Sequence, residues 1–201
     1  DEEGYSHQAQ MPDVPPPEQL RNETELTRDH QHLINENVRE KVLVDKPIEI
    51  RPVGTFNPFN PQPTEPVRHM WFRADGRLPD DPQVHRYLLA YASDFHLLGT
   101  AMLPHGISSW SRKMQVASLD HSLWFHQPLR MDDWLLYSMD SPSASGSRGL
   151  SRGQVFTGVR TQSAARCHRA ATRPGSGLCS RRREFNQIFA GQRQTRRYSH
   201  P

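Results

Sequence analysis

The sequence lacks most of the features that would place it in a membrane, a disulfide scaffold or a zinc site. Its 201 residues include only two cysteines, Cys167 and Cys179, which are too few for a disulfide framework and do not form a C-x-x-C pair. No run of 18 apolar residues occurs, so we expect no transmembrane helix. No charged and then apolar segment opens the chain, which argues against a secretory signal peptide.

Hydrophobic residues are also scarce, at 34% of the chain, whereas proline occurs 17 times. A chain with so little apolar surface is expected to leave part of its length outside the core. Residues 158–201 carry ten arginines, no lysine and one acid, while the remainder holds 15 basic and 21 acidic residues. The pI near 9.1 therefore reflects a basic tail on a mildly acidic body, and we expect no nucleic-acid partner.

Composition and patterning divide the chain into three segments. Residues 1–46 are predicted to be a Pro-rich linker, centred on Met-Pro-Asp-Val-Pro-Pro-Pro-Glu at 11–18, followed by a weakly helical stretch. Residues 47–157 carry clear strand and helix patterns. Residues 158–201 show neither alternation nor a helical stripe, so we expect an Arg-rich, disordered tail.

The middle segment predicts one long helix among several strands. Strands are expected where apolar and β-prone residues alternate or cluster: 47–53, 67–74, 114–126, 134–140 and 149–157. Apolar residues recur at helical spacing from Val84 to Met102, with Asp81 as N-cap and Pro104 as a stop signal. This predicts a single helix of about six turns. The fold class is therefore α+β, with the helix packed on one face of a sheet.

Six short motifs in the middle segment resemble the acyl-CoA thioesterase II family and follow the family's order. They are Pro-Ile-Glu-Ile-Arg at 47–51, Leu-Ala-Tyr-Ala-Ser-Asp at 89–94, Pro-His-Gly at 104–106, Ser-Leu-Asp-His-Ser-Leu-Trp-Phe-His at 118–126, Asp-Trp-Leu-Leu-Tyr at 133–137 and Ser-Arg-Gly-Leu at 147–150. The resemblance implies a double hotdog, in which each half is a long helix wrapped by a curved antiparallel sheet. Residues 11–18 resemble the family's linker, so this chain is expected to hold the linker and the C-terminal hotdog without the first.

The resemblance also implies the chemistry, which is hydrolysis of fatty acyl-CoA to free acid and coenzyme A without a cofactor. Family members hold the attacking water with an Asp, a Thr or Ser, and the Gln of a Gln-Glu-Gly motif. Carried over by position, the Asp is Asp94 and the hydroxyl is Ser118. No Gln-Glu-Gly occurs, and ungapped counting puts the Gln position near His168, so the final strand of the hotdog stays in doubt.

The residue pattern agrees with this assignment but leaves a rival carboxylate. Asp94 lies at the border of the helix's apolar stripe, which predicts partial desolvation of the kind a general base needs. On the following strand, Ser118 and Asp120 share one face, and His121 lies on the other. Asp120 is therefore a second candidate base, although a structural acceptor that caps the loop or pairs with His121 is the favoured interpretation.

Other candidate sites have weaker support. Arg148 and Arg152 flank the last predicted strand and could bind the phosphates of coenzyme A, or they could simply be surface charges. Residues 149–153 fit G-x-S-x-G, but no acid and then histidine follow in a strand–turn–helix context, so Ser151 is not expected to be a nucleophile. His121 and His126 would point to opposite faces of a strand, so we predict no metal site.

Two alternatives to an active thioesterase remain. The chain could be an inactive, truncated half-enzyme that acts at most as an assembly module, or it could be a hotdog hydratase or dehydratase. A missing final strand would leave a sheet edge unpaired, so a homo-oligomer or pairing with another hotdog domain is expected. The resemblance implies lipid metabolism in the cytoplasm, with the peroxisome as the alternative. The Ser-His-Pro end at 199–201 is not a Ser-Lys-Leu signal and disfavours that alternative.

Overall fold

The computed structural model describes residues 5, 7–55, 57–110, 114–157 and 186–194. These residues form a six-stranded antiparallel sheet with the strand order β1-β2-β4-β5-β6-β3. The strands are β1 Ile48–Pro52, β2 Val67–Ala74, β3 Met114–His121, β4 Leu135–Ser145, β5 Arg148–Thr157 and β6 Asn186–Gln194. The α-helices are α1 Glu23–Arg28, α2 Glu36–Leu43, α3 Pro82–Ala92 and α4 Leu97–Met102.

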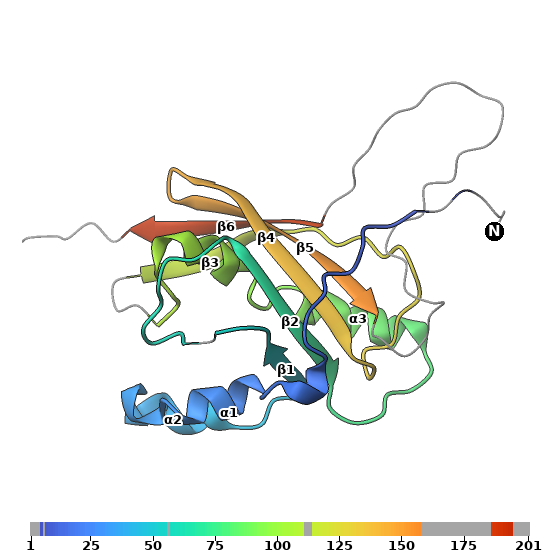
Figure 1. The fold of residues 1–201 in the computed structure, drawn as a ribbon, viewed down its shortest axis with the longest axis horizontal. Helices are drawn as coiled ribbons and strands as arrows, with labels where there is room; N and C mark the ends of the chain where they lie inside the picture. The colour runs from blue at the N-terminus through green and yellow to red at the C-terminus, as the bar shows by residue number, and fades with distance from the viewer. Residues whose placement is uncertain (1–4, 6, 56, 111–113, 158–185, 195–201) are drawn as a thin grey trace, which may run out of the picture.

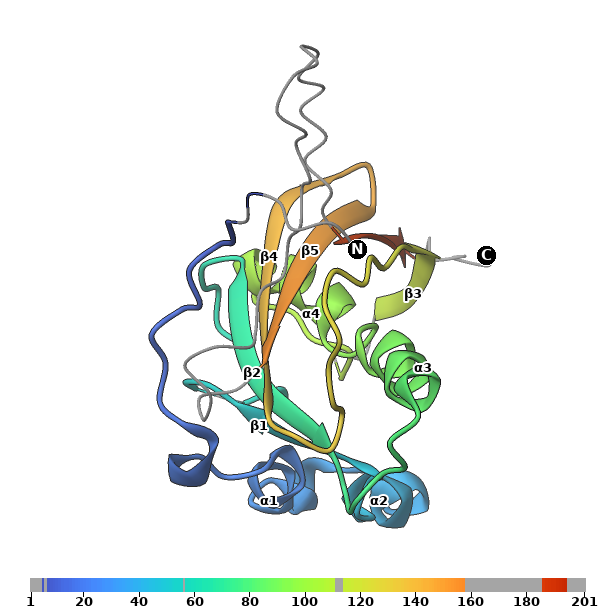
Figure 2. The ribbon, with the colours of Figure 1, turned by 90° about the vertical axis from the view of Figure 1, so that its right-hand side faces the viewer.

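The predicted α+β arrangement, a helical segment against one face of a curved antiparallel sheet, is confirmed. Figure 2 shows α3 and α4 lying on one side of the sheet, with β3 next to them. Figure 1 shows α1 and α2 together at one end of the molecule, below β1. None of the described helices is long and apolar enough to cross a membrane.

Most strands agree with their predicted positions to within one or two residues. β1, β2 and β5 lie where the sequence pattern predicted strands, whereas β3 ends at His121 instead of continuing to residue 126. β4 continues to Ser145 because it forms a long hairpin with β5, in which Ser145 pairs with Arg148. The hydrophobic pattern could predict only the apolar part of β4, and the hairpin extends beyond that part.

The single long helix of the prediction is wrong, because the structure has two helices with a break between them. α3 begins as expected, with the Asp81 side chain accepting from the Gln83 amide at 2.9 Å and Pro82 as its first residue. It ends at Ala92, and His96 then adopts φ = 62°, which an α-helix cannot contain. Apolar spacing continues through the break, so hydrophobic periodicity does not reveal it.

The core lies between the two helices and the inner face of the sheet. Its buried members come from every layer: Ile48, Ile50, Met70, Phe72, Leu89, Leu97, Met131, Leu135, Tyr137 and Met139. β5 approaches α4 closely at Gly149, where an added Cβ would lie only 2.7 Å from the Cβ of Ala101. The lack of a side chain at Gly149 thus sets the distance between helix and sheet.

The Pro-rich segment packs against the outer face of the sheet. A second buried cluster of Trp71, Leu136 and Phe156 is covered by Met11, Val14 and Leu20. Trp71 Nε1 also donates a hydrogen bond to the Pro15 carbonyl at 2.9 Å. The linker-like composition of residues 1–46 therefore includes a stretch that shares core contacts with the domain.

A strand that the sequence pattern did not indicate lies within residues 158–201. Residues 186–194 form β6, which pairs with β5 on one side and with β3 on the other. The edges of β5 and β3 each present backbone N–H and C=O groups that need partners, and a strand can satisfy them whatever its side-chain pattern. The rest of the expected tail, including Cys167, Cys179 and the position near His168, lies outside the described residues.

Candidate functional site

The two residues assigned to catalysis by resemblance lie in direct contact. Ser118 Oγ donates a hydrogen bond to Asp94 Oδ1 at 3.1 Å. Asp94 lies in the break between α3 and α4, and Ser118 lies on β3, at one edge of the described sheet. A carboxylate acceptor and a hydroxyl at this distance can together orient one water molecule.

The residue before Asp94 is held at three points. Ser93 is buried, and its Oγ donates to the Ala90 carbonyl at 3.0 Å and lies 3.0 Å from His121 Nε2. Tyr137 donates its hydroxyl hydrogen to the Ser93 carbonyl at 2.7 Å. Burial, together with the charge of Asp94, raises the pKa of Tyr137 far above its usual value, so the phenol stays a neutral donor.

A β-bulge changes which strand residues face the helix break. Ser118 pairs with Ala190, whereas Asp120 pairs with Phe189, so Leu119 is an extra residue on β3. Strict alternation predicted Ser118 and His121 on opposite faces, yet Ser118 contacts Asp94 and His121 contacts the neighbouring Ser93. His121 Nε2 lies against Ser93, and the structural role expected for Asp120, capping the loop or pairing with His121, stays a prediction.

Both members of the pair are open to solvent, which differs from the predicted border position. Asp94 and Ser118 are exposed in this chain, so the expected desolvation of the carboxylate is not found. Electrostatic assistance to an attacking water is strongest where bulk water is excluded. Within the described residues, the Asp94–Ser118 pair therefore lies on an open surface.

Residues outside the motifs contact the break, and no sequence pattern pointed to them. His96 Nε2 lies 3.3 Å from Glu23 Oε1 on α1, and Arg68 Nη1 on β2 lies 3.2 Å from His96 Nδ1. Burial opposes ionisation of Glu23, but the hydrogen bond from His96 and the nearby positive charges lower its pKa below the ordinary value. Burial lowers the pKa of Arg68, an effect that the charge of Glu23 partly offsets.

The two arginines predicted to bind phosphate differ in their surroundings. Arg152 forms an ion pair with Asp140, and hydrogen bonding to that carboxylate raises the pKa of Arg152. Arg148 is exposed and pairs with Gly191, which in turn pairs with Ala117 beside Ser118. Neighbouring residues on a strand face opposite sides of the sheet, so this register places Arg148 on the same face as Ala117 and on the opposite face from Ser118.

The other candidate sites have no geometry that supports them. Ser151 is buried in the middle of β5, so it does not lie on a nucleophile elbow at a strand–helix turn. Among the residues that the structure describes, no group of three or more His, Cys, Asp or Glu side chains is arranged to hold a metal ion.

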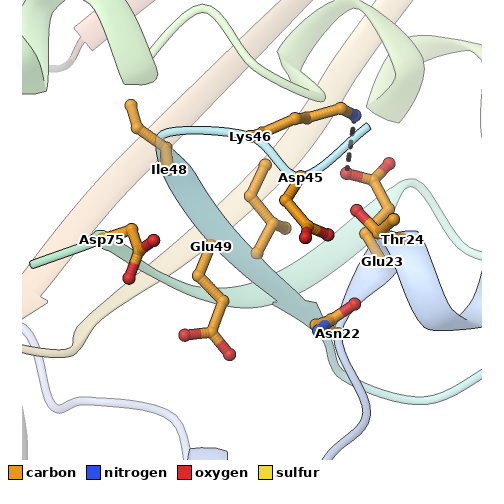
Figure 3. A pocket seen from close by; sticks show the side chains of 9 residues that line it. Asn22, Glu23, Thr24, Asp45, Lys46, Ile48, Glu49 and Asp75 are labelled. Carbon is orange, nitrogen blue, oxygen red and sulfur yellow. Dashed lines mark ion pairs between the residues drawn. The ribbon is translucent and has the colours of Figure 1, made fainter. Parts of the chain in front are cut away.

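A cavity of about 280 Å³ lies between the start of α1 and β1, and neither Asp94 nor Ser118 lines it (Figure 3). Four carboxylates line it, from Glu23, Asp45, Glu49 and Asp75, and Lys46 is its one cationic lining residue. Lys46 Nζ lies 3.8 Å from Glu23 Oε2, the ion pair drawn in Figure 3. An acidic lining repels the phosphates of coenzyme A, so this cavity does not suit that ligand.

A broken central helix and an antiparallel sheet around it define a hotdog domain, with an Asp–Ser pair where helix and sheet meet. The family model of the acyl-CoA thioesterases matches residues 37–184, and the chain belongs to that family. The resemblance drawn from the six motifs is thereby confirmed.

The curated relatives that the chain matches are also named as acyl-CoA thioesterases or thioester hydrolases. The chain is 37% identical over 156 residues to acyl-CoA thioesterase 2 of Haemophilus influenzae, covering 78% of this chain and 54% of that protein. It is 41% identical over 160 residues to human acyl-coenzyme A thioesterase 8, covering 75% and 49%. A shorter match, 29% over 79 residues, covers 39% of this chain and 22% of peroxisomal acyl-coenzyme A thioester hydrolase 1 of Saccharomyces cerevisiae.

Solved structures of similar proteins have a fold like that of this chain. The acyl-CoA thioesterase II TesB2 of Mycobacterium marinum superposes with a TM-score of 0.63 at 31% identity, covering 96% of this chain and 59% of that one. A tesB protein of Mycobacterium avium subspecies paratuberculosis gives a TM-score of 0.56 at 25% identity, covering 94% and 54%. The hotdog fold predicted from the motifs is confirmed, and the chain spans about half the length of the curated relatives first described.

Proposed function

We propose that this chain is the C-terminal hotdog, assigned to residues 47–157, of an enzyme that hydrolyses fatty acyl-CoA to free fatty acid and coenzyme A. The observation that carries the proposal is the hydrogen bond between Asp94 and Ser118 at the helix break of a thioesterase-family domain. Family membership favours this activity over the hydratase and dehydratase alternative.

In the proposed mechanism, Asp94 accepts a proton from a water that Ser118 helps to orient. The water oxygen attacks the thioester carbonyl carbon, the carbon–sulfur bond breaks, and the proton leaves with the thiolate as coenzyme A thiol. Arg148 and Arg152 stay candidate ligands for the phosphates of coenzyme A, and Arg148 is exposed. The ion pair with Asp140 makes Arg152 the weaker candidate.

A second hotdog domain, from another copy or another polypeptide, is proposed to cover the site. Asp94 and Ser118 are exposed, and large apolar side chains on α3, β3 and the segment after it are exposed as well: Tyr87, Tyr91, Leu119, Trp124 and Phe125. Exposed apolar surface of this kind is typical of protein contact sites. Light scattering over a concentration series tests this proposal, because a monomer at every concentration contradicts self-association.

The activity is tested by release of free thiol from a medium-chain acyl-CoA. Asp94→Asn and Ser118→Ala are expected to lower kcat by about 100-fold, the scale of a lost general base. Asp120→Asn is the matched control, because it neutralises the rival carboxylate two residues from Ser118 on the same strand. Full activity of Asp94→Asn, or equal losses in Asp94→Asn and Asp120→Asn, would contradict the site assignment.

Background turnover by a folded wild-type sample would instead support the alternative of an inactive half-enzyme. Hydration of an enoyl-CoA without thiol release would support the hydratase alternative. The proposed setting is lipid metabolism in the cytoplasm, with the peroxisome as the alternative that the yeast relative's name suggests. Imaging of a fluorescently tagged chain in its native cell distinguishes the two compartments.

A further inference from the structure

The backbone at the helix break adopts a conformation that its own residue disfavours. His96 has φ = 62° and ψ = −8°, in the left-handed region where a Cβ atom crowds the following carbonyl. Such a residue persists only where its surroundings hold it, and in known proteins these residues cluster at functional sites. His96 lies two residues after Asp94, so the same turn that bends at His96 also aims the carboxylate at Ser118.

The His96 ring contacts side chains from two elements that are distant in the sequence, β2 and α1. Arg68 Nη1 lies 3.2 Å from Nδ1, and because guanidinium can only donate, Nδ1 must accept. The ring proton is then on Nε2, which lies 3.3 Å from Glu23 Oε1 and donates to it. Both side chains of the last contact are largely buried, with exposed fractions of 18% for His96 and 15% for Glu23.

Glu23, at the other end of this series of contacts, is itself held by its neighbours. Glu23 is the first residue of α1, which begins with a capping box: Asn22 Oδ1 accepts from the Glu25 amide at 2.8 Å, and the Glu25 side chain accepts from the Asn22 amide at 3.2 Å. Lys46 lies 3.8 Å from the same carboxylate (Figure 3). Gly99 leaves room for the Arg68 guanidinium, which would lie 3.1 Å from a Cβ at that position.

We propose that Glu23 is a positioning residue for Asp94, acting through His96. It accepts the Nε2 hydrogen, holds the left-handed turn between α3 and α4, and thereby keeps Asp94 within hydrogen-bond reach of Ser118. Helix α1, in the weakly helical stretch predicted after the linker, then helps to shape the site. The effect on turnover rests on the proposed thioesterase activity, whereas the effect on the turn does not.

The first test measures the turn itself, by hydrogen–deuterium exchange followed by mass spectrometry. Glu23→Ala is expected to accelerate exchange in the peptide spanning 94–102, where the Thr100 amide donates to the His96 carbonyl, while β2 and β4 keep wild-type protection. Asp29→Asn is the control, because it removes an acid from the end of the same helix, where it pairs with Arg21. Acceleration in all peptides, or in none, would overturn the proposal.

The second test uses glycine to uncouple the turn from its support. Glycine takes φ = 62° without steric cost, so His96→Gly should keep the break. In the wild-type background Glu23→Ala is expected to lower kcat about tenfold, with KM changed less than twofold, because a small displacement of Asp94 affects the transition state more than binding. In the His96→Gly background the same change should alter kcat and exchange by less than twofold.

The outcomes separate the positioning role from the activity. An equal loss of kcat from Glu23→Ala in both backgrounds would show that Glu23 does not act through His96. Glu23→Gln keeps an oxygen that can accept from Nε2, so it should recover most of the wild-type exchange and kcat. If the wild-type chain shows no turnover, the proposed function fails for this chain, and the exchange measurements still decide whether Glu23 holds the turn.

Discussion

The Tyr137 hydroxyl donates to the Ser93 carbonyl at 2.7 Å, linking the middle strand of the sheet to the end of α3, one residue before Asp94. Both residues are buried, at 1% exposure each. α3 ends here, so the Ser93 carbonyl has no guaranteed partner within the helix. The phenol therefore supplies a donor to a carbonyl at the end of α3 and holds the backbone next to Asp94, the candidate base.

Tyr137→Phe is expected to destabilise the domain and to impair the site. It removes a donor and leaves a buried carbonyl without that partner, which costs about 1–3 kcal/mol of unfolding free energy. Urea unfolding measures this cost, and thiol release measures the loss of kcat. Phe72→Leu is a suitable comparison, because Phe72 packs edge-on against Tyr137 with ring centroids 5.8 Å apart. The Phe72 side chain has no donor for the Ser93 carbonyl, so this substitution changes packing alone. A Tyr137→Phe protein of wild-type stability would contradict this account.

Gly153→Ala should disturb the same ring from the opposite strand. A Cβ at Gly153 would overlap the Tyr137 ring and lie 2.8 Å from its hydroxyl oxygen. Overpacking of a buried site costs about 1–3 kcal/mol of unfolding free energy. Here a shift of the Tyr137 ring would also break its hydrogen bond to the Ser93 carbonyl. Thermal unfolding checks the shift in Tm, with Gln154→Ala, the half-buried neighbour on β5, as control. Equal effects of the two substitutions would show that close packing under Tyr137 is not the cause.

Alternation placed β1, in which every second residue is buried, whereas clustered apolar and β-prone residues placed β2 and β5, which have buried residues on both faces. The resemblance identified Asp94 and Ser118, but the sequence could not show the turn at His96, since a φ value leaves no trace in hydrophobic spacing. The bulge at Leu119 likewise breaks the alternation on which the prediction for His121 depended. β6 was missed because its support comes from the backbones of β5 and β3.

The packing of the Pro-rich segment on the sheet gives a third prediction. Trp71→Phe keeps the apolar ring in the outer cluster and removes the Nε1 donor to Pro15, which should cost about 1 kcal/mol. Cleavage within residues 11–20 by a protease of broad specificity should become faster, because the segment detaches more often. Trp110→Phe is the matched control, since Trp110 packs against Phe59 away from this cluster. Unchanged cleavage in Trp71→Phe would show that the segment is held by other contacts.

Acid should remove a stabilising contribution from Asp132, near the end of the loop that leads into β4. The hydrogen bonds from Arg130, with that from the Leu78 amide, lower the pKa of Asp132 from 3.8 to about 2. A carboxyl with a lowered pKa in the folded state stabilises the fold above its unfolded pKa and loses that contribution as pH falls through the folded value.

Asp132→Asn should therefore be less stable than wild type by on the order of 1 kcal/mol at pH 6, after allowance for the half-exposed Arg130. The difference should shrink as pH falls from about 4 to 2, because wild-type Asp132 then becomes neutral as well. Urea unfolding of both proteins across this range makes the measurement. Asp80→Asn, which removes the more exposed partner of Arg130, should show a smaller effect at pH 6. A stability difference that stays constant down to pH 2 would mean that the charge of Asp132 is not what stabilises the loop.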